Sequence, residues 1–252
     1  MNQNDNLTLE GILPYLTDQT IAERLFLYDT IDSTNTETKR RAIQGAESGT
    51  VILADRQTAG RGRLGRDFHS PAGSGVYLSI LLRLHIPMEQ AVLVTTAASV
   101  VACRAVEAVT GQSLAIKWVN DLYLNGKKVC GILAEAVNDA IVVGIGINCT
   151  TVFDGELAER AGSLGFAGIR CRLAAELVNE LARLETMIAK QNFLTEYRAR
   201  SMILGEEVTI LQEPGSCYIA EDIGDKGELI LRDSSGNRRI LSTGEISIRL
   251  AD

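Results

Sequence analysis

The chain has 252 residues, of which 46% are hydrophobic and 23% are charged. This is the composition of a globular protein, so a disordered or fibrous chain is excluded. The formal net charge of −7 disfavours nonspecific binding to DNA or to an anionic membrane.

The first predicted elements alternate strands with a helix and a long loop. Residues 25–32 predict a strand, and a charged surface helix follows to about residue 46, capped by Ser33, Thr34 or Asn35. Residues 50–54 predict a short buried strand. A glycine-rich loop, residues 57–75, then leads into a strand at 75–84. Residues 88–110 have helical length and an apolar face, with Gly111 as the expected C-cap.

The centre of the chain predicts a meander of short strands. The apolar residues 114–118 come first, and residues 121–124 and 127–137 flank Asn125-Gly126, the strongest two-residue hairpin signal. A turn at Asn138-Asp139 leads into a third strand, residues 140–148. Helices are expected at 168–190 and at about 192–203.

From Gly205 onwards the sequence changes character. Short strand-like runs separated by turn residues predict a small β-barrel. These runs are residues 208–212, 217–222, 228–233, 238–242 and 245–249. We therefore expect two domains, residues 1–203 and residues 204–252.

The segment 56–66, at the start of the glycine-rich loop, contains four arginines interleaved with glycines: Arg56, Arg61, Arg63 and Arg66, with Gly60, Gly62 and Gly65. We reject its match to the dinucleotide-binding pattern G-x-G-x-x-G, because the residues after it cannot open a helix. Arginine binds carboxylate and phosphate through paired hydrogen bonds, so we interpret the loop as a mobile cover for an anion. A solvated surface loop is the plainer alternative, and an RGG-like contact with nucleic acid lacks interleaved aromatic residues.

Two glycines lie on one face of the strand at 140–148, since side chains alternate along a strand. Gly144 and Gly146 predict that something lies close against the backbone, either a flat ligand such as adenine or biotin, or a packed helix. Gly131 predicts a second close approach. Lys117, in an apolar strand start, needs a partner for its charge, and an ion pair with Asp121 is the structural alternative to a catalytic role.

Several classes of protein and site are disfavoured. Five cysteines without C-x-x-C spacing favour reduced cytosolic thiols over disulfides or zinc. Two histidines are too few for a histidine-rich metal site, and no G-x-S-x-G motif is present. The N-terminus lacks a signal peptide, and the apolar run from Ala91 to Cys103 is too short to span a bilayer. We expect a cytoplasmic protein.

Taken together, the motifs resemble those of biotin–protein ligases, in the same order and over roughly residues 25–250. The motifs are DSTN (32–35), Q-x-x-GRGRLGR (57–66), KWVND (117–121), KKVCGILAE (127–135), GIGIN (144–148) and GEIS (244–247). The resemblance implies an α+β, class II synthetase-like catalytic domain with a mixed sheet and flanking helices, followed by an SH3-like barrel. It also implies that biotin is activated with ATP and Mg²⁺ to biotinyl-5′-AMP. Biotin is then transferred to a lysine of the biotin carboxyl carrier domain of a biotin-dependent carboxylase.

The same resemblance assigns residues to the site. It implies that Lys128, Lys117 and Arg63 stabilise charge at the reacting carboxylate and phosphate, and that Asp121 orients or deprotonates the acceptor lysine. The ureido head of biotin would meet Ser33, Thr34, Asn35, Gln57 and the backbone near Arg61. Asn120 and Asn148 fall on the nucleotide side, and Gly131, Gly144 and Gly146 line the cavity. Gly60, Gly62, Arg66, Trp118 and Phe68, which could stack on adenine, complete the set.

Two positions depart from the family pattern. Val119 stands where proline is usual, which we expect to loosen the backbone, and Phe68 replaces a frequent tryptophan. Too few residues precede Leu25 for a helix-turn-helix domain, so we expect a stand-alone enzyme without a nucleic-acid partner. A lipoate–protein ligase is the alternative of the same fold, although its R-R-x-x-G-G-G signature is absent. A noncatalytic biotin- or nucleotide-binding regulator is the alternative of another class, and the sequence leaves monomer and homodimer open.

Overall fold

The computed structural model describes residues 5–84, 91–210, 213, 215–242 and 248–250. Its centre is a seven-stranded sheet in the order β1-β2-β3-β7-β6-β5-β4. The strands are β1 (Leu25–Ile31), β2 (Val51–Gln57), β3 (Gly75–Leu82), β4 (Ala115–Lys117), β5 (Asp121–Leu124), β6 (Lys127–Val137) and β7 (Ala140–Asn148). β1 and β2 are parallel and β2 and β3 antiparallel, so the predicted mixed sheet is confirmed.

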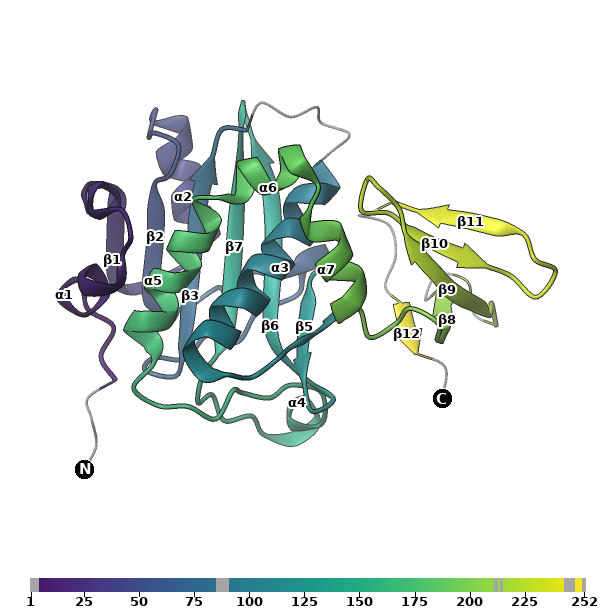
Figure 1. Cartoon of the computed structure of the whole chain (residues 1–252). Helices are drawn as coiled ribbons and strands as arrows, with labels where there is room; N and C mark the ends of the chain where they lie inside the picture. The colour runs from purple at the N-terminus through teal and green to yellow at the C-terminus, as the bar shows by residue number, and fades with distance from the viewer. Residues whose placement is uncertain (1–4, 85–90, 211–212, 214, 243–247, 251–252) are drawn as a thin grey trace.

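Helices cover both faces of this sheet (Figure 1). One face carries α3 (Ala91–Thr110), α5 (Arg170–Leu181), α6 (Leu184–Lys190) and α7 (Phe193–Arg200), and the other carries α2 (Thr34–Ile43). Ser33 is the N-cap of α2, as predicted, and its hydroxyl accepts a hydrogen bond from the Thr36 amide. Shorter elements are α1 (Leu9–Ile12), η1 (Leu13–Tyr15), η2 (Gln19–Arg24), η3 (Arg63–Gly65) and α4 (Gly155–Arg160).

The central helix α3 is predominantly apolar, and its charged residues are Arg104 and Glu107. The stretch Val92–Thr110 is long and apolar enough to cross a membrane by length and composition, but 67% of it is buried inside the protein. It is therefore the core helix, packed against the sheet and against α5, α6 and α7. The helix continues to Thr110, beyond Cys103, where the run that we judged too short to span a bilayer ends. Met88–Gln90, where we expected it to begin, lie outside the described residues.

The hairpin turns follow their sequence signals. Asn125 and Gly126 have φ angles of 51° and 76°, the left-handed pair that a two-residue turn requires, and Asn138 has a φ of 50°. Gly111 ends α3 with a φ of 74°. These local predictions are confirmed.

The single helix predicted at 168–190 is wrong. The chain forms α5 and α6 with a break at Ala182-Arg183, and α5 begins only after Gly168, whose φ is 76°. No glycine or proline marks the break. It is a consequence of packing, because the change of direction buries Leu184, Met187 and Ile188 beside α3.

The C-terminal part forms a separate five-stranded antiparallel sheet in the order β11-β10-β9-β8-β12. Its strands are β8 (Glu207–Ile210), β9 (Tyr218–Ile223), β10 (Leu229–Arg232), β11 (Arg238–Leu241) and β12 (Ile248–Leu250). The last strand returns to pair with the first, as in a small curled barrel. The predicted all-β end is confirmed, whereas residues 211–212 and the GEIS motif at 244–247 lie outside the described residues.

The turn between β9 and β10 packs against the larger part of the chain. The Trp118 indole nitrogen donates a hydrogen bond of 3.0 Å to the Gly227 carbonyl, and this contact is buried. Arg198 of α7 donates to the Ile223 carbonyl at 2.8 Å. A Cβ on Gly227 would approach Val92 of α3 at 2.9 Å, so the backbone of the turn lies directly on that helix.

Candidate functional site

A cavity of about 780 Å³ lies between the sheet, the start of α2 and the glycine-rich loop, residues 57–75. Its size is typical of a site for a small molecule or cofactor. Almost all the residues singled out from the sequence line it. They are Ser33, Thr34, Asn35, Gln57, Arg61, Gly62, Arg63, Arg66, Phe68, Lys117, Trp118, Asn120, Asp121, Lys128, Gly131, Gly144 and Gly146.

The loop lies against a floor of glycines. Gly131 of β6 and Gly146 of β7 are directly paired across the sheet. The Phe68 ring lies on this pair, because a Cβ would meet the ring at 3.1 Å on Gly131 and at 2.5 Å on Gly146. Here the close approach that the glycines predicted is filled by the protein's own aromatic ring. Larger side chains at these positions would displace the ring and with it the loop.

Gly144 is explained by helix packing, the alternative that the sequence left open. The Asn35 side chain of α2 lies so close to Gly144 that a Cβ there would overlap its Oδ1 atom. The Asn35 Oδ1 atom also accepts a hydrogen bond of 2.6 Å from the Ser79 hydroxyl. The adjacent pair Leu133–Gly144 completes this part of the floor.

The end of the cavity beside α2 is a network of neutral polar groups. The Gln57 Oε1 atom accepts hydrogen bonds from the Thr34 amide at 2.8 Å and from its hydroxyl at 3.1 Å. The Gln57 Nε2 atom donates to the Ser70 hydroxyl at 2.9 Å. One N–H of this amide remains for a ligand. The network is partly buried and suits an uncharged polar group with both donors and acceptors.

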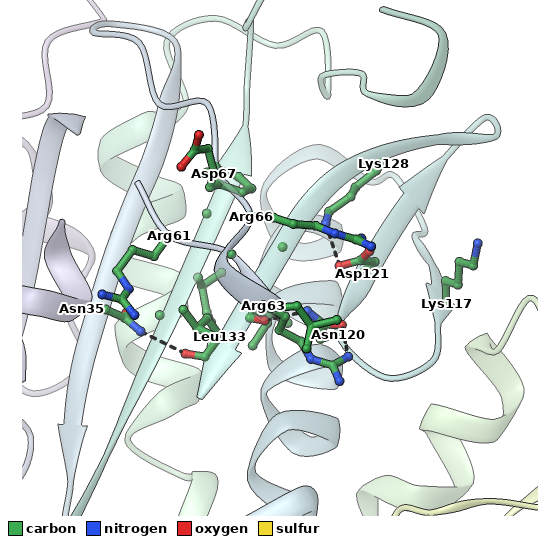
Figure 2. Close-up of a pocket in the computed structure, with 18 of the residues that line it drawn as sticks. Asn35, Arg61, Arg63, Arg66, Asp67, Lys117, Asn120, Asp121, Lys128 and Leu133 are labelled. Atoms are coloured by element: carbon green, nitrogen blue, oxygen red, sulfur yellow. Dashed lines mark hydrogen bonds and ion pairs between the residues drawn. The ribbon is translucent and has the colours of Figure 1, made fainter. Parts of the chain in front are cut away.

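The other end of the cavity is cationic (Figure 2). Lys128 forms an ion pair with Asp121, with 2.7 Å between Nζ and Oδ1. Arg63 donates a hydrogen bond of 3.1 Å to the Asn120 Oδ1 atom, and burial lowers the pKa of its guanidinium from its ordinary value. It stays charged nonetheless. Figure 2 shows Arg66 extending into the same part of the cavity. This end suits a ligand with negative charge.

The ion pair that we considered for Asp121 is made by a different lysine. Lys128, on the neighbouring strand β6, pairs with Asp121. Lys117 instead has its ammonium 5.8 Å from the centre of the Tyr123 ring, a cation–π contact. The strand β5 lies between β4 and β6, so either lysine could reach it, and only the tertiary geometry separates them.

We expected the backbone at Val119 to be loosened, but its carbonyl is fixed by two hydrogen bonds. The hydroxyls of Ser99 and Tyr197 each donate to this carbonyl at 3.2 Å. The Trp118–Val119 peptide bond is cis, and the Val119 side chain is buried. Trp118 and Asn120 on either side line the cavity.

Two predicted residues do not line the cavity. Gly60 is a buried residue within the loop, where its carbonyl accepts a hydrogen bond of 2.9 Å from the Phe68 amide. Asn148 is buried at the end of β7 and donates to the Gly162 carbonyl at 3.0 Å. Within the described part of the chain, its Oδ1 atom has no hydrogen-bond partner.

Sequence reasoning missed several lining residues, among them Tyr123, Glu159 and Arg160. Glu159 and Arg160 belong to the short helix α4, which follows the GIGIN motif at 144–148. The chain after α4 is tied to the hairpin because the Gly162 amide donates to the Lys128 carbonyl at 2.9 Å. No local sequence pattern predicts this contact, because it joins segments that are more than thirty residues apart in the chain.

Comparisons with known protein families agree with this geometry. Residues 27–151 match the Biotin/lipoate A/B protein ligase family, and residues 203–249 match the Biotin protein ligase C terminal domain. The first match contains every residue singled out for the cavity.

Individual relatives are similar over most of the chain. The bifunctional ligase/repressor BirA of Bacillus subtilis is 32% identical, covering 90% of this chain and 75% of its own length. The biotin–[acetyl-CoA-carboxylase] ligase of Mycobacterium tuberculosis is 35% identical, covering 85% of both chains. The solved biotin protein ligase from Aquifex aeolicus in complex with biotin and ATP is 28% identical. It aligns with a TM-score of 0.76 over 91% of this chain and 100% of that chain.

Proposed function

This chain belongs to the biotin protein ligase family, and we infer that it is itself a biotin–protein ligase. The observation that supports this function best is the polarity of the cavity: a neutral hydrogen-bonding end beside α2 and a cationic end beside the β5–β6 hairpin. Biotin has a ureido head and a carboxylate tail, and ATP adds its phosphates beside that carboxylate. A ligand pair of this kind fits the two ends in one orientation.

The proposed reaction has two steps, adenylation of biotin and transfer of the biotinyl group to a lysine. In the first, a carboxylate oxygen of biotin attacks the α-phosphorus of ATP, which forms biotinyl-5′-AMP and releases pyrophosphate. In the second, a lysine amine attacks the activated carbonyl, AMP leaves, and the amine loses a proton. Both reactants of the first step are anionic, so catalysis depends mainly on positioning and on cations at the reacting atoms.

We propose that Lys128, Lys117 and Arg63 supply these cations. Lys128 is paired with Asp121 at 2.7 Å, and it could turn to an incoming phosphate oxygen. That movement would release the Asp121 carboxylate to orient the acceptor lysine or take its proton.

At the opposite end we propose that Ser33, Thr34, Asn35 and Gln57 form the site for the ureido head. The free N–H of Gln57 and the Ser33 hydroxyl can donate to a carbonyl. Asn35 plays a restricted part, because its Nδ2 atom already donates to Leu133 and Glu135. We propose that Asn148, with its unsatisfied Oδ1 atom, serves the nucleotide side.

Mg²⁺ is expected to enter with ATP. Over the described residues, no group of three or more histidine, cysteine, aspartate or glutamate side chains could hold a metal ion. Magnesium in nucleotide sites commonly keeps several waters and is bound through the phosphates and one or two carboxylates. The donors present fit a nucleotide-borne ion, whose chemistry is to neutralise phosphate charge.

We propose that the acceptor is the biotin carboxyl carrier domain of a biotin-dependent carboxylase, because the relative from Mycobacterium tuberculosis is named for acetyl-CoA carboxylase. We further propose a catalytic domain of residues 1–203, a barrel domain of residues 204–252 and a cytoplasmic location.

The test is to incubate the protein with biotin, ATP, Mg²⁺ and an isolated carrier domain, and to weigh the carrier by mass spectrometry. We expect a gain of one biotinyl group, and none when the acceptor lysine of the carrier is changed to arginine. Lipoate with a lipoyl domain is the matched control, and no gain is expected. A gain with lipoate alone would identify a lipoate ligase, and no gain with either would point to a noncatalytic regulator.

A further inference from the structure

A carboxylate lies beside the neutral end of the cavity and is not explained by the proposed chemistry. Glu135 of β6 receives three polar groups from two other segments. The Lys39 ammonium lies 2.8 Å from Oε1, the Arg61 guanidinium lies 3.4 Å from the same oxygen, and the Asn35 amide lies 3.0 Å from Oε2. Lys39 and Asn35 belong to α2, and Arg61 belongs to the glycine-rich loop.

These contacts keep Glu135 ionised. Partial burial raises the pKa of its carboxyl, but the hydrogen bonds from Lys39 and Asn35 and the charge of Arg61 outweigh burial, so the pKa lies below its ordinary value. An ionised carboxylate would repel the anionic groups of the proposed ligands. Glu135 therefore acts on the cations of the protein itself, and Figure 2 shows Arg61 beside Asn35 at this end of the cavity.

We propose that Glu135 is a positioning residue that latches the glycine-rich loop over the cavity through Arg61, while Lys39 competes for the same oxygen. This inference rests on the proposed function, since the latch matters only while biotinyl-5′-AMP is held. Elsewhere the loop contacts the rest of the protein through, among others, Phe68 on the Gly131–Gly146 pair, Arg63 on Asn120 and Gln57 on Thr34. Glu135 joins the arginine-rich part of the loop to α2, whereas Gln57 meets Thr34 of α2 at the start of the loop.

The strength of the contact suits a latch that must open. The Arg61 side chain is half exposed, and ion pairs of this kind are weak, so the loop can leave without a large barrier. Because Lys39 and Arg61 share Oε1, each lowers the negative potential that attracts the other. Removing Lys39 should therefore strengthen the contact of Arg61, whereas removing the charge of Glu135 should abolish it. The two substitutions are predicted to act in opposite directions.

The experiment measures dissociation of chemically synthesised biotinyl-5′-AMP from the full-length protein. Trp118 is the single tryptophan and lines the cavity, so its fluorescence reports release directly. We expect Glu135→Gln to release the adenylate about two- to fivefold faster and Lys39→Met about twofold slower, as befits an exposed ion pair. Asp139→Asn removes a more exposed carboxylate from its pair with Arg83, away from the cavity, and should leave the rate unchanged.

A double variant separates the latch from a structural role. If Glu135 acts through Arg61, Glu135→Gln should add nothing to the release rate of Arg61→Gln. The proposal is wrong if Glu135→Gln releases the adenylate at the same rate as the protein without substitutions. It is also wrong if Glu135→Gln and Lys39→Met change the release rate in the same direction. Should Glu135→Gln fail to fold, Lys39→Met decides alone, and a rate that is unchanged or faster sinks the proposal. If the protein without substitutions neither forms nor binds the adenylate, the proposed function is wrong, and the proposed role of Glu135 is then wrong as well.

Discussion

The ammonium of Lys128 and the carboxylate of Asp121 lie 2.7 Å apart, half-buried at the cationic end of the cavity. Before any ligand binds, each neutralises the other, which limits the cost of holding charge in a partly desolvated site. An incoming phosphate competes for the lysine, and the carboxylate then becomes available to the acceptor amine. One contact thus connects the proposed first step of the reaction to the second.

Lys128→Ala should slow the formation of biotinyl-5′-AMP by roughly tenfold to a few hundredfold. A lost charge-assisted hydrogen bond costs about 1.5–3 kcal/mol, and here it is lost where charge develops. A single-turnover assay of adenylate formation measures the effect. Formation at the normal rate would instead make Lys117 the phosphate-stabilising lysine.

Arg63→Ala should still form the intermediate but release it early, because its contact with Asn120 helps to hold the loop over the cavity. The released anhydride would then biotinylate exposed lysines of an unrelated protein, which a blot detects. Arg56→Ala is the matched control, since Arg56 is exposed and does not line the cavity. Loss of adenylation without faster release would make Arg63 a direct catalytic group.

At the scale of elements, the glycine-rich loop covers the cavity and presents its tip to solvent. Leu64 at this tip is exposed and has a φ of 57°, and Phe68 further along the loop lies on the sheet. Segments with few buried contacts open locally at low free-energy cost.

We expect trypsin to cut the unliganded protein after Arg61, Arg63 or Arg66, and biotin plus ATP to suppress the cleavage. Cleavage in the β10–β11 hairpin, after Arg232 or Arg238, is the internal control and should not change. Equal cutting of the loop with and without ligand would show that it does not close over the cavity.

The helices α3 and α7 are joined by the carboxylate of Glu196. Glu196 of α7 accepts hydrogen bonds from Arg104 of α3 at 2.6 Å and from Arg200 at 2.9 Å. Partial burial raises the pKa of Glu196, but these two arginines outweigh it, so the pKa lies below its ordinary value of 4.5. A depressed pKa stabilises the fold fully above the unfolded value, and the contribution is lost as the pH falls below it.

Glu196→Gln should therefore lower the free energy of unfolding by about 1–2 kcal/mol at pH 7, with a smaller difference at pH 4. Urea titrations at the two pH values measure this. Glu156→Gln, at an exposed pair with Arg160, should have little effect at either pH. A constant difference across pH would mean that packing of the side chain, rather than its charge, is responsible.

At the scale of the molecule, the C-terminal sheet meets the wall of the cavity. Trp118 lines the cavity on one side and donates its indole N–H to the Gly227 carbonyl on the other. The β9–β10 turn is further held by Arg198. The two sheets are thus linked through a residue that also contacts the proposed ligands.

Trp118→Phe should lower the free energy of unfolding by about 1–3 kcal/mol, because it leaves the buried Gly227 carbonyl without its donor. Urea unfolding followed by circular dichroism measures the loss. Arg198→Ala acts on the same turn, so the double variant should lose less than the sum of the two single losses. Full additivity would mean that the two contacts are independent.

The sequence by itself determined the strands, their turns and most of the residues that line the cavity. Asn125-Gly126 and Asn138 adopt left-handed angles for local steric reasons, and Ser33 caps α2 through its own hydroxyl. Alternation along a strand placed Gly144 and Gly146 on one face. Such features depend on neighbours close in the chain, so they can be predicted without a fold.

Only the tertiary structure decided which charged side chains form ion pairs and which side chains lie against the glycines of the sheet. Asp121 pairs with Lys128 rather than Lys117, and Glu135 gathers side chains from α2 and from the loop. Asn35 and Phe68 occupy the space over the glycines, and Trp118 reaches Gly227 more than a hundred residues away. These contacts join segments that are distant in the chain, and local patterns carry no information about which distant partner a side chain will find.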